Sequence, residues 1–374
     1  MRAGHQDAGL HHIGRQPVGL RHAELQQTSR IPLWVTDLSL AGVATTWGLN
    51  HVIVKHTLAN MHPLAFNAIR FGLASLTLLV ILRLAEGGPA RGSGRGAARS
   101  SRLGAAGGMW VRPVDTRPVI RVSLLGHTLY QLCFIMGLSL TTAGKTAVIL
   151  AVSPACVACL EHFTGRERYS HRSWAGILAS LLGVALVTAG GKDGLSLAGG
   201  ELRGDLLVLA ATVCWAGYTV TSRPLLHSYS ALRITALTIS VGTVPLIFVS
   251  WPTLMHQPWA EVTSTSWAAL LFSFAVPVVI GYILWSWGIQ RLGSGRTAIY
   301  GNLSPLVASF VGWIVLGETW SLLQLAGAGL ILFGITQVRK GQPRARSRQV
   351  APMVDDPLHG KAGGAASPAT KPCP

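Results

Sequence analysis

The chain has 374 residues, of which 49% are hydrophobic and only 12% are charged. Soluble globular domains average about 25% charged residues, because they need a polar surface. A chain this long with half that fraction cannot cover a water-facing domain, so much of it must be surrounded by lipid. The formal net charge is +17. The basic residues lie in short runs between apolar segments, which favours loops that set membrane topology, and no nucleic-acid partner is expected.

Residues 1–33 form a polar tail with four arginines and none of the apolar run that a signal peptide needs. Ten apolar segments follow, most of them 18–24 residues long, which is the length with which an α-helix crosses ~30 Å of hydrocarbon. They occupy residues 34–54, 64–84, 119–140, 144–161, 174–190, 205–222, 233–251, 267–290, 295–316 and 321–338. The pattern therefore predicts an all-α membrane protein with about ten transmembrane helices.

Three polar segments interrupt or end this pattern. Residues 85–118 are rich in Gly, Arg and Ser and are predicted to form a flexible basic loop. Their glycines do not follow a strand or open a helix, so a phosphate-binding loop is rejected. Residues 191–204 are predicted to form a Gly-rich linker, and residues 339–374 a disordered tail. Between them lie two predicted domains, 34–190 and 205–338.

The distribution of basic residues predicts which side of the membrane each loop faces. With a cytoplasmic N-terminus, ten helices place 26 of the 31 Lys and Arg residues on the cytoplasmic side. The other side receives four: Lys55, Lys145, Lys192 and Arg203. Cytoplasmic loops carry such an excess of Lys and Arg. We therefore expect a multi-pass protein of a bacterial-type plasma membrane with both termini in the cytoplasm.

The chain contains an internal repeat. A shift of 151 residues places 144–183 on 295–334 without a gap, and eleven of the forty positions are identical. The identical pairs include Pro154 with Pro305 and Glu167 with Glu318. A shift of 168 residues aligns the starts of the two halves, so that Asp37 falls on Asp205, Trp47 on Trp215 and Lys55 on Arg223. Two halves of five helices each must insert with opposite orientation, as in transporters that alternate access around a central site.

The order and duplication of several short motifs resemble the drug/metabolite transporter superfamily, and specifically EamA-type members with two tandem EamA domains. The first half carries Thr46 to Asn50, Lys55, Pro63, Arg70 and the Ser153-Pro154 pair. The second half carries Gly204 to Tyr218, Asn302 to Pro305 and Leu316 to Thr319. The resemblance covers roughly residues 34–338.

Membership of this family implies ten helices, an inverted repeat and secondary transport, often efflux of amino acids or other metabolites. No catalytic residues, cofactor or metal are expected, because the chain shows neither a metalloprotease motif nor Cys/His metal spacing. The expected partners are a small-molecule substrate and the lipid bilayer, and a homodimer is compatible with the sequence. A membrane-embedded enzyme or a sensor on the same scaffold is the alternative; vectorial movement in liposomes separates a carrier from an enzyme.

Arg70 is the only Lys or Arg well inside a predicted span. A charge near mid-membrane costs ~2.5–3.5 kcal/mol even on the lenient insertion scale, so it should face the bundle interior or water. Two interpretations stay open: a counter-charge for an anionic or zwitterionic substrate, and a structural arginine that bonds helix carbonyls or Asp37. The other substrate-path candidates are polar or aromatic residues within the predicted spans: Trp47, Asn50, Trp215, Tyr218, Tyr282, Trp285, Asn302 and Ser304.

Pro154 and Pro305 are predicted to kink corresponding helices, since each removes a backbone hydrogen bond and is preceded by a serine that can satisfy freed groups. Glu167 and Glu318 are expected to have loop roles instead of coupling protons. Each lies three residues before a serine that can cap the next helix.

Overall fold

The computed structural model describes residues 31–86, 111–141, 143–189, 202–307 and 321–341. All regular structure in these ranges is helical. The described helices belong to one compact unit, Pro32–Gln342. The second unit consists of the two tails and lies almost wholly outside the described residues.

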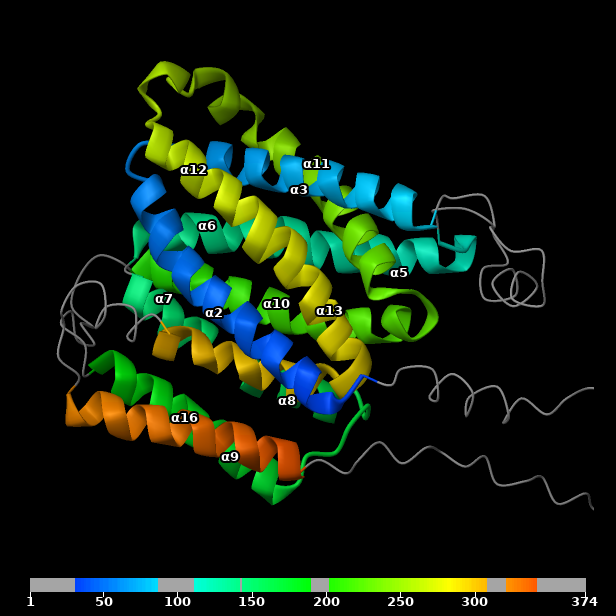
Figure 1. Cartoon of the computed structure of the whole chain (residues 1–374), viewed down its shortest axis with the longest axis vertical. Coiled ribbons are helices and arrows are strands. Elements are labelled where there is room, and N and C mark those ends of the chain that lie inside the picture. The colour runs from blue at the N-terminus through cyan, green and yellow to red at the C-terminus, as the bar shows by residue number, and fades with distance from the viewer. Residues whose placement is uncertain (1–30, 87–110, 142, 190–201, 308–320, 342–374) are drawn as a thin grey trace, which may run out of the picture. The chain divides into compact units, whose positions relative to one another are not determined.

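Within the described residues, the first half of the chain forms eight helical segments, shown from dark blue to green in Figure 1. They are α2 (Leu33–Thr57), α3 (Pro63–Glu86), α5 (Pro113–Ser123), the π-helix η1 (Leu124–Leu129), α6 (Tyr130–Leu140), α7 (Ala143–Leu150), α8 (Ser153–Phe163) and α9 (His171–Ala189). The segments α5, η1 and α6 follow one another without a break.

The second half begins with two long helices, α10 (Leu202–Ser228) and α11 (Ala231–His256). The segments that follow are η2 (Trp259–Glu261), α12 (Ser264–Ser273), the π-helix η3 (Phe274–Ile280), α13 (Gly281–Leu292), α14 (Ser294–Ala298), η4 (Ile299–Asn302) and α16 (Leu322–Gly341). Leu303–Leu306 continue in helical conformation, and residues 308–320 lie outside the described part.

Three sequence predictions about helix bounds are wrong. The segment 85–118 is not wholly a loop, because α5 already begins at Pro113, where proline's fixed φ favours a first helical turn. The segment 144–161 is two helices, α7 and α8, separated at Ala151-Val152. The predicted break after 222 is absent, because α10 continues to Ser228 through Pro224.

Six described helical stretches are long and apolar enough to cross a membrane: Pro63–Glu86, Pro113–Leu140, Leu202–Ser228, Ala231–His256, Ser264–Leu292 and Leu322–Gly341. Two shorter apolar stretches, Val148–Phe163 and His171–Val187, add to them. Helix α2 has 25 residues but a more polar composition.

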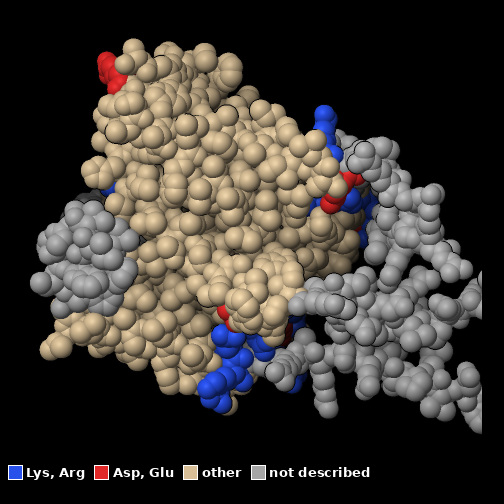
Figure 2. All heavy atoms as spheres, viewed as in Figure 1, with Lys and Arg blue, Asp and Glu red and all other residues tan. Residues whose placement is uncertain are grey.

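Apolar side chains also cover the outer surface of the helices. Phe248 and Leu84 are 81% and 79% exposed, and the face in Figure 2 is almost free of charge, with its Lys, Arg, Asp and Glu side chains near the margins. Water would penalise such a surface, whereas lipid tails would not. The chain is therefore a helical membrane protein with several spans.

Helices α9 and α16 lie side by side over their length and share the most extensive helix contact (Figure 1). Glycines make this approach close. A Cβ atom added at Gly183 would lie 2.7 Å from the carbonyl oxygen of Gly327, and one at Gly176 would lie 2.8 Å from that of Gly334. Small residues permit such backbone contact in membrane helices.

These glycine contacts follow the repeat. The shift of 151 residues carries Gly176 onto Gly327 and Gly183 onto Gly334, so each contact maps onto the other. A second pair of contacts is related by the repeat in the same way. A Cβ atom added at Gly137 would lie 2.7 Å from Val208, and one added at Gly288 would lie 2.7 Å from Leu40. The shift of 151 residues carries Gly137 onto Gly288, and the shift of 168 residues carries Leu40 onto Val208. The two π-helices, η1 and η3, also fall at corresponding places under the shift of 151 residues.

Candidate functional site

Irregular backbone surrounds one cavity in the interior of the bundle. The α7–α8 break contributes Ala151 and Ser153, the π-helix η3 contributes Pro277 and Val278, and the segment after α14 contributes Gly301. Backbone of this kind is tolerated at membrane depth where it is buried in protein or lines a cavity. π-Helical turns are likewise frequent at functional sites.

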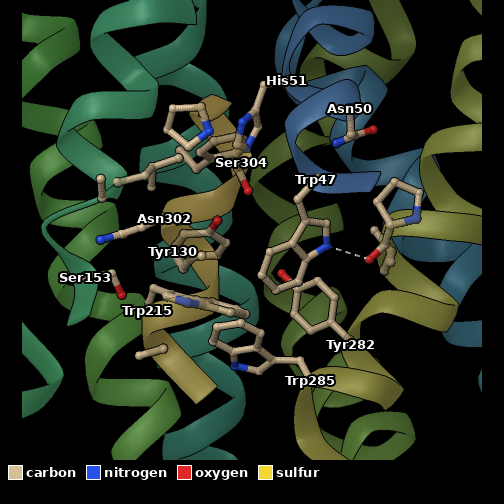
Figure 3. A pocket seen from close by; sticks show the side chains of 18 of the residues that line it. Trp47, Asn50, His51, Tyr130, Ser153, Trp215, Tyr282, Trp285, Asn302 and Ser304 are labelled. Carbon is tan, nitrogen blue, oxygen red and sulfur yellow. Dashed lines mark hydrogen bonds between the residues drawn. The ribbon is translucent and has the colours of Figure 1, made fainter. Parts of the chain in front are cut away.

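The cavity contains about 790 Å³ of space not filled by protein atoms, its opening included. Helix α2 supplies one wall, and α6, α10 and α13 supply others (Figure 3). The lining is mainly aromatic, with polar groups placed between the rings. The polar and aromatic lining residues are Trp47, Asn50, His51, Arg70, Tyr130, Gln131, Phe134, Ser153, Trp215, Tyr282, Trp285, Asn302 and Ser304.

Three tryptophans pack against one another in the cavity. The ring of Trp47 lies 5.4 Å from that of Trp215 and 5.0 Å from that of Trp285, and the last two lie 5.4 Å apart. The Trp47 indole donates a hydrogen bond of 3.0 Å to the carbonyl of Pro277 (Figure 3, dashed line). This bond attaches α2 of the first half to η3 of the second, and aromatic pairs of this geometry contribute ~0.5–1.5 kcal/mol beyond burial.

Arg70 reaches the same cavity from α3 and is only 2% exposed. Its guanidinium donates to Ser273 Oγ at 3.1 Å, to Asn67 Oδ1 at 2.7 Å and to Gln131 Oε1 at 3.1 Å. All three acceptors are neutral side chains, and Arg70 Nε has no partner.

Among the described residues no acidic side chain lines the cavity, so Arg70 is its charged group. The structural alternative of a bond to Asp37 is wrong: Asp37 instead accepts from Arg339 at 2.6 Å and from Tyr300 at 2.7 Å. Arg70 also does not bond helix carbonyls, because all three of its acceptors are side-chain oxygens. A buried cation held only by neutral groups retains most of its attraction for an anion.

Several further polar atoms of the lining are buried without a hydrogen-bond partner. They are Asn50 Oδ1, Ser153 Oγ, Trp285 Nε1 and Asn302 Oδ1. An unsatisfied buried polar group costs ~1–3 kcal/mol, so native proteins keep few of them. Their concentration around one cavity is what a site for a polar ligand requires.

The structure brings most of the predicted residues together. Trp47, Asn50, Arg70, Trp215, Tyr282, Trp285, Asn302 and Ser304 all line the cavity, together with the two predicted kink residues Pro154 and Pro305. Pro154 stands in the first turn of α8, so it begins a helix after a break and does not bend a continuous one. Tyr218 does not line the cavity and is fully buried behind it.

Sequence reasoning missed His51, Tyr130, Gln131 and Phe134, which also line the cavity. Tyr130 and Gln131 directly follow η1, in a helix with no repeated motif to single them out. His51 had a usable signal, since it directly follows Asn50 in the first motif.

The loop glutamates follow expectation where they are described. Glu167 forms an ion pair of 2.6 Å with Arg223, and Ser170 accepts a hydrogen bond from the backbone of Ser173 at the start of α9, which confirms the predicted cap. Ser321 caps α16 in the same way through the backbone of Gln324. Glu318 lies outside the described residues.

A second polar group lies behind the aromatic rings and is closed. His127, on η1, contacts Thr238 through Nε2 at 3.2 Å, and its Nδ1 has no partner. Tyr218 packs against the His127 ring with 5.0 Å between ring centroids, and the hydroxyl of the next residue on α10, Thr219, is buried without a partner. The repeat relates this group to the open cavity, because the shift of 168 residues carries His51 onto Thr219 and Arg70 onto Thr238.

Comparison with known proteins agrees with this geometry. The sequence matches the EamA-like transporter family over residues 34–189 and 202–339. The chain therefore belongs to the EamA-like transporter family.

Individual relatives are distant but similar over most of their length. The chain is 28% identical to the uncharacterized transporter YyaM of Bacillus subtilis, over 80% of this chain and 91% of the relative. It is 23% identical to a probable amino-acid metabolite efflux pump of Salmonella typhimurium, over 78% and 91%. It is 28% identical to a probable terminal-alkyne amino-acid exporter of Streptantibioticus cattleyicolor, over 63% and 78%. One crystal structure shares the fold with a TM-score of 0.62 at 16% identity, covering 81% of this chain and 94% of that one.

Proposed function

We propose that this protein is a secondary transporter that exports a small carboxylate metabolite, an amino acid or a related compound, by alternating access between two inverted halves of five helices. Family membership and the names of two relatives support export of an amino-acid metabolite. The cavity supports the carboxylate. Its charged group is the Arg70 guanidinium, with a free Nε donor beside aromatic walls.

The repeat-related contacts support the inverted arrangement. The seam between α9 and α16 and the contacts of Gly137 and Gly288 each map onto a counterpart in the other half. The open cavity and the closed polar group behind it are related in the same way. Such pairing is what a carrier needs if its two halves exchange conformations to open the site on either side.

A matched series of three compounds tests the charge preference. Phenethylamine, phenylalanine and 3-phenylpropionate share a phenyl ring and carry a positive, a zwitterionic and a negative charge. We expect purified protein to be stabilised by phenylalanine or 3-phenylpropionate and not by phenethylamine, because a ligand bound by the native state raises its melting temperature. Stabilisation by phenethylamine alone would contradict the assignment of Arg70 as the anchor.

Flux through proteoliposomes that contain the full chain tests transport itself. Isotope-labelled forms of the bound compound should accumulate inside vesicles preloaded with the unlabelled compound. Chemical conversion without movement would instead support a membrane enzyme.

The proposed orientation is tested separately. Reporter fusions at residues 100 and 345 should report the cytoplasm, and one at residue 196 should report the outside, because the basic residues gather on the first side. A periplasmic signal at residue 100 would contradict this orientation.

A further inference from the structure

A buried carboxylate, Glu161, lies away from the cavity and has no part in the proposed substrate path. It stands in the last turn of α8, and its side chain is 0% exposed. An acidic residue within a membrane helix is costly and usually functional. Sequence analysis did not select it, since the repeat places Gly312 at the corresponding position of the second half.

Glu161 belongs to a cluster that joins the two halves at the end of the bundle where α10 ends and α14 begins. Arg223 of α10 donates to Glu167 at 2.6 Å and to Glu161 at 3.4 Å through the same Nη1 atom. Tyr169 donates to the other oxygen of Glu161 at 2.5 Å, and the hydroxyl of Ser294 on α14 also faces this carboxylate. Arg223 and Glu167 are 22% and 27% exposed, so of these three charged groups only Glu161 is fully buried.

The charges of this cluster do not balance. One guanidinium faces two carboxylates, and it lies closer to the more exposed of them. The guanidinium also lies at the C-terminus of α13, where Gly293 adopts φ +86° and a Cβ atom would be 3.2 Å from Arg223 Nη2. The partial negative charge at the C-terminus of that helix also attracts the guanidinium, which reduces the charge available to Glu161.

The other titratable groups nearby do not neutralise this excess of negative charge. Arg166, in the loop after α8, directs its guanidinium to the carbonyl of Val220. Other titratable side chains on the neighbouring segments include His162, Arg168, His227, Arg291 and Arg296. Within the described residues, none of these five has a hydrogen bond or ion pair to Glu161. A buried carboxylate with a shared cation and hydroxyl partners is neutralised most readily by a proton.

We propose that Glu161 is a proton-binding site, that it holds a proton while this end of the bundle is closed, and that it releases the proton to water when this end opens. The step balances as Glu161–COOH giving Glu161–COO⁻ and H⁺ on opening, with the reverse on closing. Helix α8 connects this site to the cavity, because Ser153 lines the cavity and Glu161 lies eight residues further on, ~12 Å at 1.5 Å per residue. The inference rests on the proposed alternating access.

Labelling with dicyclohexylcarbodiimide tests the proton site without a substrate, because this reagent attacks protonated carboxyl groups in apolar surroundings. We expect mass spectrometry of the full chain in membranes to find the label on Glu161, with a yield that falls as the pH is raised. Glu167 provides the matched control, since it shares the same arginine but is partly exposed, and it should stay unlabelled. Absence of label on Glu161 at acidic pH, or a yield independent of pH, would overturn the proposal.

A second experiment connects the proton to opening. In a background without native cysteines, Thr219→Cys should react with a membrane-impermeant maleimide faster at alkaline than at acidic pH. In a protein that carries both Thr219→Cys and Glu161→Gln, the maleimide reaction rate should follow only the ionisation of the thiol. The ratio of the rates with and without Glu161→Gln at each pH therefore reports the contribution of Glu161. If Glu161→Gln fails to fold, Tyr169→Phe replaces it and should move the pH profile towards alkaline values, because the carboxylate loses a hydrogen bond.

Equal pH dependence in both backgrounds would overturn the coupling. Flux of phenylalanine or 3-phenylpropionate is measured on the same vesicles. Normal flux that Glu161→Gln leaves unchanged would refute the proton site but not the transport proposal. Absent flux in a protein whose Glu161 reacts with dicyclohexylcarbodiimide would refute the transport proposal but not the proton site.

Discussion

Arg70 is the residue on which the substrate assignment depends. Burial of its guanidinium among Asn67, Gln131 and Ser273 leaves the charge uncompensated by any described acidic group. The aromatic groups around it add to the stabilisation, since the guanidinium carbon lies 5.1 Å from the centre of the Phe71 ring. These neutral partners orient the arginine and leave Nε available to a ligand.

Arg70→Gln should weaken binding of 3-phenylpropionate by about 10- to 100-fold, because a hydrogen bond to a charged group contributes ~1.5–3 kcal/mol. Arg70→Lys keeps the charge but loses the planar fork, so it should be intermediate. Melting temperature and flux are measured on one preparation. Arg233→Gln, which breaks an ion pair with Glu86 outside the cavity, is the control and should retain flux. Full flux by well-folded Arg70→Gln would refute the role.

The sequence was sufficient to predict Arg70 from a charge inside a span and Trp47 and Trp215 from a duplicated motif, while Trp285 was selected as an aromatic residue within a span. It was not sufficient for Tyr218. The shift of 168 residues places Tyr218 on Asn50, so the motif indicates both, but only Asn50 lies on the side that is open. Glu161 was missed because its burial arises from α10 and α14, which are distant in sequence.

At the scale of elements, the periodic apolar segments predict where helices exist but not where they are interrupted. The π-helix η3 and the α7–α8 break are marked only by Pro277 and Pro154, and the π-helix η1 contains no proline at all. The spacing of these interruptions nevertheless decides which side chains face the cavity. Helices α9 and α16 are different, since the glycines that bring them together are visible in the sequence and recur in the repeat.

Gly183→Ala should lower the melting temperature by several degrees, because its Cβ atom would lie 2.7 Å from Gly327 O and the helices would have to separate. Overpacking of this kind typically costs ~1–3 kcal/mol. Gly329→Ala on α16 is the matched control: nothing lies within 4 Å of its added Cβ atom, so stability should be unchanged or slightly higher. Equal melting temperatures for the two variants would show that the seam is not tightly packed.

Pro154→Ala and Pro305→Ala should each reduce flux more than they reduce stability. Both prolines line the cavity at corresponding places in the repeat, and alternating access needs a deformable element in each half. Flux and melting temperature are compared for the single and double variants. A double variant with normal flux would show that the prolines only contribute packing.

At the scale of the whole molecule, the proposed alternating access requires that the aromatic cavity open at one end of the bundle while the other end is closed. The closed end is held by ion pairs between the halves, including Arg223 with Glu167 and Arg339 with Asp37. At the opposite end, Thr141 Oγ1 donates a hydrogen bond of 2.5 Å to Asp205, and Lys55 donates one of 2.7 Å to the carbonyl of Leu138. The repeat predicts that the closed polar group around Thr219 becomes the lining when the conformation reverses.

Accessibility of two repeat-related positions from the two sides of the membrane tests this account most directly. His51→Cys and Thr219→Cys are made singly after the five native cysteines, Cys133, Cys156, Cys159, Cys214 and Cys373, have been replaced. A membrane-impermeant maleimide should label His51→Cys from the outside and Thr219→Cys from the cytoplasmic side. Ile177→Cys, which is buried on α9, should stay unlabelled. Labelling of both positions from the same side, or no labelling of Thr219→Cys in a protein that still transports, would contradict alternating access around this cavity.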